Sequence, residues 1–423
     1  MSAESEVRRR IQERGKITFA EFMDIALYWP QGGYYTTREP VGAVGDYYTS
    51  PAVHPAFGAL LSVQLYQMWR LMDRPAPFTV LELGAGNGLL CRDIVTYSTG
   101  LPEGFAASLQ YISLDRRPVT SVEPTTAEHR TPMTNRVLSD GVPFRGLQGC
   151  VLSNEYLDAF PVHQVVMAGD GLKEIYVGLE REDLVEWTGE PSDPGLADRL
   201  DGLGITLVEG QTAEMNLALD RYSQDVAEAL DRGFVLTIDY GRTAQDLYDP
   251  EQRLRGTLVT YHQHVQTDSP LTRIGRQDIT AQVDFTSVAR AGENAGLDTL
   301  GLVTQRDFLS NLNLDLLRAK LAAQQLSAHQ LRANRAGLID LVRPGGLGDF
   351  KVLAQLKNVA GVHLWGLEGP ADTSEMQGLA VPRLTKDHLS LVDNRHGGAE
   401  TEFEALWPPA NPNTETDQYP QYP

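Results

Sequence analysis

Three polar side chains that can hold a cation follow one short apolar stretch of this chain. Asn154 and Glu155 come directly after Val151-Leu152-Ser153, and Asp158 follows three residues later. Carboxylates bind guanidinium and ammonium groups through charge-assisted hydrogen bonds, and an arginine stays protonated, so its nitrogen needs an anionic partner that orients it. A structural alternative exists, because Asn154 can cap the following turn and the two acids can pair with arginines or cap the next helix.

A second set of candidate residues forms a glycine loop after another apolar stretch, in 80-VLELGAGNGLL-90. Glycine lets the backbone turn sharply and lets a ligand approach the main chain where a Cβ atom would clash. The dinucleotide fingerprint G-x-G-x-x-G needs a glycine at position 89, which is Leu89, so a nicotinamide-dependent oxidoreductase is disfavoured. E/D-x-G-x-G-x-G is the pattern of Rossmann-like methyltransferases that bind S-adenosylmethionine. We therefore expect this cofactor to be bound by Glu82, Gly84, Ala85, Gly86 and Gly88.

An acid near the end of the second strand should complete the cofactor site by bonding the ribose hydroxyls, as it does in dinucleotide sites. The apolar residues 111–114 predict that strand, and Asp115 follows them directly. Asp115 is therefore the first candidate for this contact. Glu123 is a weaker second choice.

The order of apolar and helical segments predicts how these residues meet. A strand that runs into the glycine loop is expected within 78–88, further strands are expected at 111–114, 151–153, 234–241 and 350–357, and helices at about 53–72 and 217–230. Alternating strands and helices are typical of an α/β fold, with a mostly parallel sheet and helices on both faces. Ligands bind beyond the carboxyl ends of the strands in such a sheet. The strand that ends at Asn154 should lie beside the glycine loop, which favours a role of Glu155 and Asp158 at the methyl acceptor.

Three regions are predicted along the chain. Residues 1–52 form N-terminal helices and an aromatic lid segment, residues 53–357 form the methyltransferase domain, and residues 358–423 form a C-terminal extension whose Pro-rich end should be disordered. The domain has two insertions, at about 162–215 and 242–280. The first insertion opens with the alternation typical of two antiparallel strands, and the second is polar and loop-like.

The composition limits the partners of the protein. Lys and Arg total 36 and Asp and Glu total 56, which gives a formal net charge of −20. This excess repels phosphate backbones and anionic lipids, so we expect no nucleic-acid binding and no membrane insertion, whereas a basic or Arg-bearing protein substrate is favoured. Cys91 and Cys150 form no CxxC pair, and His262 and His264 lack an acid at ligand spacing. No disulfide framework and no metal site are therefore expected.

The N-terminus predicts the compartment. MSAESEVRRRIQERG contains no apolar core of a signal peptide, and Glu4 and Glu6 argue against a mitochondrial presequence despite the neighbouring arginines. The low cysteine content fits a reducing environment. We therefore expect a cytoplasmic protein.

Nine short motifs are dispersed in order over about residues 8–357. They are 22-FMDIALYWPQGGYY-35, 45-GDYYTSP-51, 57-FG-58, 81-LELGAGNG-88, 153-SNEYLDAFPVHQ-164, 236-LTIDYG-241, 256-GTLVTYHQH-264, 278-DITAQVDFT-286 and 349-DFKVL-353. Together they resemble the MidA-like methyltransferases. That family includes the mitochondrial protein arginine methyltransferase that assists the assembly of respiratory complex I.

The resemblance implies a Rossmann-like methyltransferase fold with insertions that acts on a protein. The mitochondrial relative symmetrically dimethylates an arginine of a complex I subunit. By this resemblance, Gly84, Gly86 and Gly88 line the cofactor, and Glu155 and Asp158 sit at the acceptor.

The resemblance also concerns the segment before the first long helix. It implies that Gly45-Asp46-Tyr47 closes over the site, which adds Gly45 and Asp46 to the expected cofactor contacts. The chain departs from the family pattern at two positions, where Ala52 replaces a glutamate and Gln282 replaces a histidine.

The sequence thus predicts an S-adenosylmethionine-dependent methyltransferase that acts on a protein arginine, with Glu155, Asp158 and Asn154 as the catalytic candidates. Two alternatives stay open. One is a small-molecule methyltransferase, for which a narrow apolar site is expected, and the other is a non-catalytic assembly factor that retains the fold. Asp239, near the end of the predicted strand 234–241, can be either a structural cap or a substrate contact.

Overall fold

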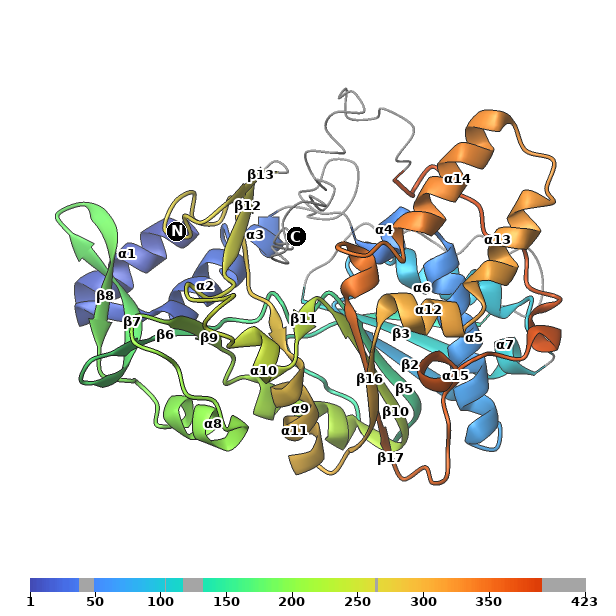
Figure 1. Ribbon diagram of the computed structural model, residues 1–423, viewed down its shortest axis with the longest axis horizontal. Helices are drawn as coiled ribbons and strands as arrows, with labels where there is room; N and C mark the ends of the chain where they lie inside the picture. The colour runs from blue at the N-terminus through green and yellow to red at the C-terminus, as the bar shows by residue number, and fades with distance from the viewer. Residues whose placement is uncertain (38–48, 103, 117–131, 263–264, 390–423) are drawn as a thin grey trace.

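A seven-stranded sheet forms the centre of the structure, which is a computed structural model that describes residues 1–37, 49–102, 104–116, 132–262 and 265–389 (Figure 1). The strand order is β16-β17-β10-β5-β2-β3-β4. The strands are β2 (Phe78–Leu83), β3 (Leu109–Asp115), β4 (Met133–Leu138), β5 (Leu147–Asn154), β10 (Leu230–Asp239), β16 (Asp298–Thr304) and β17 (Lys351–Lys357). All neighbouring pairs from β4 to β10 are parallel, whereas β17 runs antiparallel to β10 and β16. The predicted mostly parallel sheet is confirmed.

The register of the parallel strands aligns their carboxyl ends. Leu83 of β2 pairs with Ser153 of β5, and Ile238 of β10 pairs with Asn154. The glycine loop after β2, the turn after β5 and the end of β10 therefore lie at one edge of the sheet, where α/β proteins bind ligands.

Helices cover both faces of this sheet, because successive residues of a buried strand point to opposite sides. Val80, Leu152 and Leu236 pack in one hydrophobic cluster, and their neighbours Leu81 and Val151 pack in another. The first face carries α5 (Ala56–Leu71), α6 (Leu89–Ser98), α12 (Gln305–Asn311), α13 (Leu314–Ala322) and α14 (Ala328–Asp340). The second face carries α9 (Leu219–Ala229) and α11 (Phe285–Asn294), and Figure 1 shows α5 and α9 on opposite sides.

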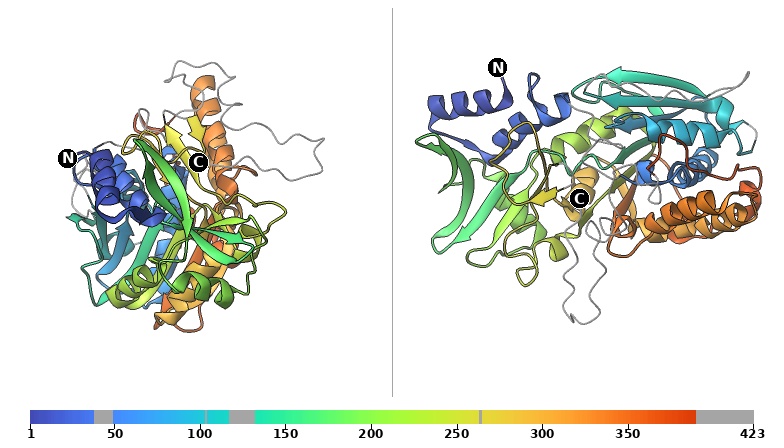
Figure 2. Two further views of the ribbon diagram at one scale, coloured as in Figure 1. Left: turned by 90° about the vertical axis from the view of Figure 1, so that its left-hand side faces the viewer. Right: turned by 90° about the horizontal axis from the view of Figure 1, so that it is seen from above.

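A second, antiparallel sheet lies at the other end of the long axis from α13 and α14 (Figures 1 and 2). It consists of β1 (Lys16–Thr18), β6 (His163–Ala168), β7 (Gly171–Glu180), β8 (Asp183–Gly189) and β9 (Thr212–Met215). Helices α1 (Ala3–Arg14) and α2 (Phe19–Tyr28) pack on it through a separate cluster that includes Phe22 and Val177. The antiparallel pair predicted at the start of the first insertion is confirmed by β6 and β7.

The second insertion is not the polar loop that the sequence predicts. It contains a three-stranded sheet of β12 (Val259–His262), β13 (Val265–Thr267) and β14 (Asp278–Thr280). Each strand has only three or four residues, and Thr260 and Thr280 are buried. Strands this short give too few positions for an alternation of apolar and polar residues to be recognised.

Short elements complete the description. They are α3 (Tyr34–Thr37), α4 (Ser50–Val53), α7 (Phe105–Ser108), α8 (Gly195–Leu203), β11 (Gly241–Arg242), α10 (Ala244–Leu247), β15 (Val283–Asp284) and α15 (Trp365–Glu368), with 3-10 turns at Leu347–Asp349 and Thr373–Met376. Within the described residues, no helix combines the length and the apolar character that a membrane span requires.

The described part of the C-terminal extension packs on the main core. Leu364, Ala371, Met376 and Leu379 are buried in the same cluster as α5 and α13. These apolar residues are spaced irregularly among Gly, Pro and Asp, so no helix or strand period announces them. The Pro-rich end expected to be disordered lies outside the described residues.

This packing predicts that the extension stabilises the fold. Met376 has 0% exposure, and its truncation in Met376→Ala should lower the free energy of unfolding by about 2–5 kcal/mol through lost burial and a new cavity. The matched control Ile339→Ala truncates a side chain that is 55% exposed, and it should change stability by only about 0.5 kcal/mol. Urea unfolding of both variants measures the difference. Equal effects would contradict a structural role of the extension.

Candidate active site

The turn after β5 is held by a buried carboxylate from the neighbouring strand. One oxygen of Asp239, Oδ2, accepts N–H bonds from Tyr156 at 3.1 Å, from Leu157 at 2.9 Å and from Asp158 at 3.4 Å. The N–H of Glu155 continues the ladder by donating to the carbonyl of Ile238 at 2.8 Å. Asp239 therefore acts as a cap of this turn, which is one of the two roles that the sequence left open.

Glu155 and Asp158 project from this turn with different partners. Glu155 has a left-handed backbone, with φ of 49°, and its Oε1 accepts bonds from the Ser50 N–H and the Asn154 amide, both at 3.1 Å. The Oδ2 atom of Asp158 accepts the hydroxyl of Thr280 at 3.1 Å. The Oδ1 atoms of Asp158 and Asn154 are buried and have no hydrogen-bond partner among the described residues. The turn thus presents acceptor atoms that remain available to a ligand.

The three carboxyls share a site that disfavours their ionisation. Burial, and then the nearby Asp158, raise the pKa of Glu155 to about 8, and burial raises the pKa of Asp158 to about 6. Burial and the charges of both neighbours raise the pKa of Asp239 well above its ordinary value. Within the described ranges, no Lys, Arg or His is paired with any of the three. A cation that entered the site would favour the ionised forms.

Two tyrosines lie near Asp158. Tyr28 and Tyr35 stack with ring centroids 5.6 Å apart, and the guanidinium of Arg116 lies 4.4 Å from the centroid of Tyr28. The hydroxyl of Tyr28 donates to the carbonyl of Ala159 at 2.8 Å, and that of Tyr35 donates to Asp278 Oδ2 at the same distance. Burial raises the pKa of both tyrosines well above 10, so they line the site as neutral groups.

The glycine loop needs glycine for two different reasons. Gly84, Gly86 and Gly88 all have positive φ, between 50° and 81°. A Cβ atom on Gly84 would lie 2.5 Å from the ring of Tyr156, whereas a Cβ on Gly86 would meet nothing within 4 Å. Gly84 therefore lets the turn after β5 pack on the loop, and the space beside Gly86 is open to a ligand.

Two side chains, one from β3 and one from β4, form hydrogen bonds to the backbone of this loop. Asp115 Oδ2 accepts the Gly86 N–H at 2.9 Å, and Arg136 Nη2 donates to the Gly86 carbonyl at 2.6 Å. Ala85, also in the loop, is 7% exposed. Asp115 thus contacts the loop directly, on the same edge of the sheet as the turn after β5.

Glu82 occupies a different position from the loop residues. It is only 4% exposed, its carboxyl accepts the hydroxyl of Tyr111 at 3.1 Å, and burial raises its pKa to about 8. Its side chain therefore lies beneath the loop, where it bonds to the sheet.

Several predicted residues cannot be placed in this way. Gly45, Asp46 and Glu123 lie outside the described residues. Of the two departures from the family pattern, Ala52 is 2% exposed in α4, and the backbone N–H of Gln282 donates to Thr257 Oγ1 at 3.1 Å. Among the residues that the structure covers, no cluster of three His, Cys, Asp or Glu could hold a metal ion.

Comparison with known proteins shows the family of this chain. A family model described as "Putative S-adenosyl-L-methionine-dependent methyltransferase" matches residues 60–303. The chain belongs to this family. The glycine loop with its open side at Gly86 and the adjacent carboxylate of Asp115 fit S-adenosylmethionine, which is the cofactor of this methyltransferase.

Relatives of this methyltransferase cover almost its whole length. "Protein arginine methyltransferase NDUFAF7 homolog, mitochondrial" from Drosophila melanogaster is 30% identical over 398 residues, 86% of each chain. "Protein arginine methyltransferase NDUFAF7, mitochondrial" from Rattus norvegicus is 27% identical over 405 residues, 88% of each chain. A Burkholderia thailandensis protein, solved bound to S-adenosyl-homocysteine, is 26% identical with a TM-score of 0.74, over 88% of this chain and 96% of that one. The resemblance to the MidA-like methyltransferases is confirmed.

The predicted cytoplasmic localisation is wrong by the same comparison, since the curated relatives from Drosophila melanogaster and Rattus norvegicus are mitochondrial. The expectation depended on Glu4 and Glu6 near the N-terminus. Glu6 is 2% exposed in α1 and forms ion pairs with Arg9 and Arg10. Ion pairs within a folded helix therefore account for both acids, since Glu4 pairs with Arg8 in the same helix.

Some residues of the site escaped the sequence analysis of this methyltransferase. Ser50 contributes a backbone N–H, for which side-chain type gives no signal. Arg136 lies in β4, where no residue is fully buried and the apolar pattern is correspondingly weak. Thr280 stands in the motif 278-DITAQVDFT-286 but carries no charge that would draw attention to it.

The packing of Gly84 against Tyr156 predicts a defect in cofactor binding. In Gly84→Ala, the new methyl group must displace the ring and the loop, which should weaken binding of S-adenosyl-homocysteine about tenfold or more. Isothermal titration calorimetry measures this affinity. Gly146→Ala is the matched control, because Gly146 has φ of 74° with open space around it and precedes β5 at the opposite edge of the sheet. Wild-type affinity in Gly84→Ala would contradict the assigned role of this contact.

Proposed function

We propose that this methyltransferase methylates an arginine side chain of a protein. The proposal rests on three buried carboxyls, those of Glu155, Asp158 and Asp239, which lie beside the cofactor loop. None of them has a basic partner among the described residues. A guanidinium is a cation with five N–H donors, and the site offers anionic and unfilled acceptor atoms to it. The names of the relatives from Drosophila melanogaster and Rattus norvegicus, both protein arginine methyltransferases, support the same substrate.

In this proposal the acidic turn orients the acceptor. Glu155 and Asp158 hold the guanidinium through charge-assisted hydrogen bonds, and the Oδ1 atom of Asn154 accepts a further N–H. Glu155 is the primary partner, because it follows the strand end directly. Transfer from the sulfonium of S-adenosylmethionine needs an in-line approach, so holding one nitrogen in place and excluding water contribute most. Tyr28 and Tyr35 provide the apolar wall that excludes water.

The loop residues hold the cofactor. Gly84, Ala85, Gly86 and Gly88 supply a main chain that a ligand can approach closely, and Asp115 is positioned to accept the ribose hydroxyls. We assign Glu82 to support of the loop from below, since its carboxyl bonds Tyr111. Closure of Gly45 and Asp46 over the site stays a prediction from the family resemblance.

The proposed domain organisation follows the same division of tasks. The N-terminal region, residues 1–52, supplies Tyr28, Tyr35 and Ser50 to the acceptor site. Residues 53–357 form the methyltransferase domain with its insertions, and residues 358–423 are its extension.

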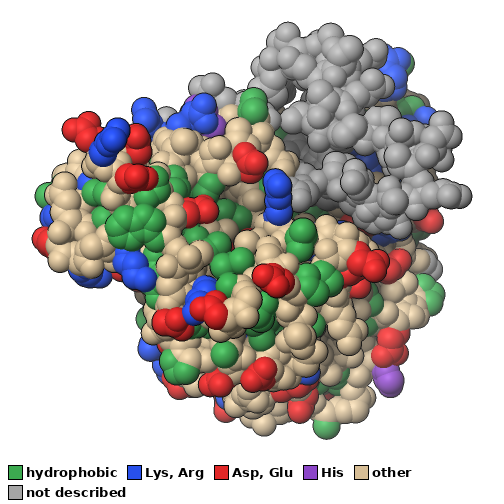
Figure 3. All heavy atoms as spheres, turned by 60° about the vertical axis from the view of Figure 1, so that its left-hand side comes forward, with side chains coloured by type: hydrophobic (Ala, Val, Ile, Leu, Met, Phe, Trp, Pro, Cys, Tyr) green, Lys and Arg blue, Asp and Glu red, His purple; other side chains and the backbone are tan. Residues whose placement is uncertain are grey.

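The substrate class follows from local rather than overall charge. On the face drawn in Figure 3, Asp and Glu side chains are interspersed with Lys and Arg. In this proposal, the carboxyls of the site select the basic segment. A subunit of respiratory complex I is the first substrate to test, because the family resemblance includes the arginine methyltransferase that assists its assembly.

Removal of one carboxylate tests the proposal directly. Glu155→Gln should lower methyl transfer about a hundredfold or more, because loss of one partner of a buried charge pair costs about 2–5 kcal/mol. Asp158→Asn should act in the same direction. Binding of S-adenosyl-homocysteine should persist, since neither residue is in the glycine loop. The matched control is Glu228→Gln, which removes the same charge at a side chain that is 59% exposed.

Arginine-directed mass spectrometry of extracts with wild type or Glu155→Gln measures the outcome. Identical methylation maps would remove the basis for an arginine substrate. Activity on small molecules alone would identify a small-molecule methyltransferase, and cofactor binding without any transfer would identify a non-catalytic assembly factor.

The raised pKa values predict the pH profile. Free Glu155, with a pKa of about 8, is mostly protonated at pH 7, although the proposed role needs its anion. The value of kcat/KM should therefore rise with pH, by up to about tenfold per unit, and level off above about pH 8. A bound guanidinium favours the anion, so the rise in kcat should occur at lower pH. Initial rates with an arginine peptide measure both, and a kcat/KM that is constant from pH 6 to 9 would contradict the proposal.

A further inference from the structure

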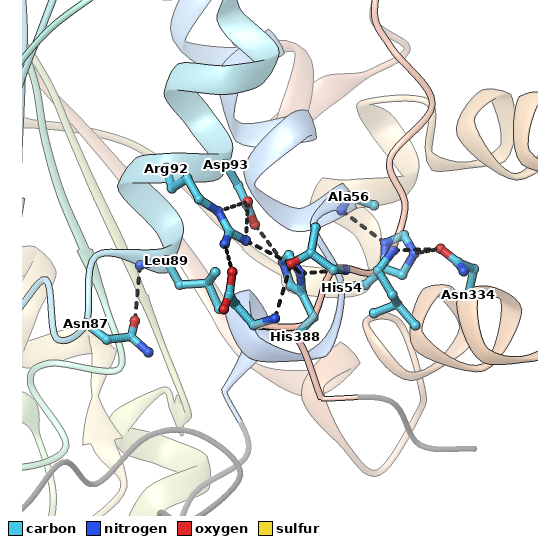
Figure 4. A network of polar contacts seen from close by, with 11 residues as sticks. His54, Ala56, Asn87, Leu89, Arg92, Asp93, Asn334 and His388 are labelled. Carbon is cyan, nitrogen blue, oxygen red and sulfur yellow. Dashed lines mark hydrogen bonds and ion pairs between the residues drawn. The ribbon is translucent and has the colours of Figure 1, made fainter. Parts of the chain in front are cut away.

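Residues 384–389 are the last that the structure describes, and their side chains bond to α6 (Figure 4). This segment is named the clasp. The side chain of His388 is 1% exposed, and its Nε2 lies 2.9 Å from Oδ2 of Asp93. Asp93 Oδ1 accepts a bond from Arg92 Nε at 3.2 Å, and Arg92 Nη1 lies 2.5 Å from Oδ2 of Asp387. Two buried residues of α6 thus hold the clasp through charged contacts.

His388 has further contacts within the clasp. Its Nδ1 lies 3.2 Å from the backbone N of Thr385 and 2.9 Å from the Thr385 hydroxyl, while Nε2 on the other side of the ring faces Asp93. His54 also faces His388, and burial lowers the pKa of His54 to about 3, so that ring is neutral. The charged groups around His388 are therefore Asp93, Arg92 and Asp387.

The clasp also contacts α4, near the C-terminal end of this short helix. The N–H of Leu389 donates to the carbonyl of Ala52 at 2.8 Å, and that of Leu384 donates to Asn334 Oδ1 at 2.9 Å. Asn334 Oδ1 also lies 3.2 Å from Nε2 of His54, the residue that follows α4, as Figure 4 shows. A Cβ atom on Gly337 of α14 would lie 3.0 Å from the carbonyl of Val53. Helix α4 is thus enclosed between the clasp and α14.

The N-terminal end of α4, Ser50, contacts the acidic turn after β5. The N–H of Ser50 donates to Oε1 of Glu155 at 3.1 Å, and its hydroxyl bonds to Oε1 of Gln305 at 3.0 Å. Helix α4 has only four residues, so the carbonyl of Ala52 and the N–H of Ser50 belong to one helical turn. A displacement at one end of such a turn moves the other end.

We propose that His388, through its bond to Asp93, is a positioning residue for Glu155: the clasp fixes α4 so that the Ser50 N–H stays aimed at the carboxylate that receives the acceptor. This inference rests on the proposed function of Glu155. Buried charged networks add little net stability compared with apolar packing, because desolvation offsets most of the attraction. Their geometry is nevertheless specific, which suits a contact that must hold one backbone N–H in place.

The test measures the ionisation of Glu155 through the pH dependence of kcat/KM. Its remaining neighbours are Asp158, Asp239 and the Asn154 amide, and the Ser50 N–H is one of the contacts that lower its pKa. In His388→Leu, loosening of the clasp should move the rise of kcat/KM to higher pH by about one unit, as expected for a lost hydrogen bond to a charged group. The value of kcat at pH 7 should fall about tenfold. Binding of S-adenosyl-homocysteine should stay within about twofold of wild type, since Gly84 and Gly86 are untouched.

The matched control is Lys320→Met. Lys320 Nζ donates to the carbonyls of Met376, Gln377 and Leu379, so this variant loosens the same C-terminal chain away from α4. Its pH profile should match that of wild type. If His388→Leu fails to fold, Asp387→Asn removes a contact of the clasp at a side chain that is 30% exposed, and a smaller upward displacement is expected.

The outcomes distinguish a failure of the proposed role of Glu155 from a failure of the proposed role of the clasp. A wild-type profile without any rise near pH 8 would overturn the proposed role of Glu155 itself. A normal wild-type profile that neither His388→Leu nor Asp387→Asn displaces, even with a lower melting temperature, would show that the clasp only stabilises the fold.

Discussion

The site depends on one buried carboxylate. Asp239 accepts three backbone N–H groups of the turn after β5, and this holds Glu155 in a left-handed conformation that costs about 1–2 kcal/mol for a residue other than glycine. The parallel register of β5 and β10 brings Asp239 to this position. The same turn places the ring of Tyr156 over Gly84, so the acidic turn and the glycine loop share one set of contacts.

This arrangement concentrates negative charge where burial opposes it. Glu155, Asp158 and Asp239 have raised pKa values and no basic partner within the described residues, so their burial costs folding free energy. The apolar clusters on the two faces of the sheet, which include Leu236 and Val235, provide the compensating stability. A charge arrangement that weakens the fold but favours a cationic substrate is a common feature of active sites.

The sequence predicted the parts of this structure that depend on local pattern. Continuous apolar runs identified β2 and β5, and glycine spacing identified the loop, because both constraints act on neighbouring residues. It did not predict β4 or β16, whose residues are at most partly buried, or the antiparallel direction of β17. The acidic turn was recognisable by residue type. Its partner on α4, a backbone N–H some hundred residues earlier, depends on tertiary packing alone.

The place of β17 has a consequence for how the chain is made. This strand lies between β10 and β16, although its residues, 351–357, follow both of them along the chain. A nascent chain on the ribosome therefore carries the exposed edge of β10 through the synthesis of more than a hundred further residues. Open edges of this kind pair readily with other strands. The enzyme should accordingly need protection from aggregation until translation is almost finished, and premature termination before β17 would leave β16 separated from the other strands of the sheet.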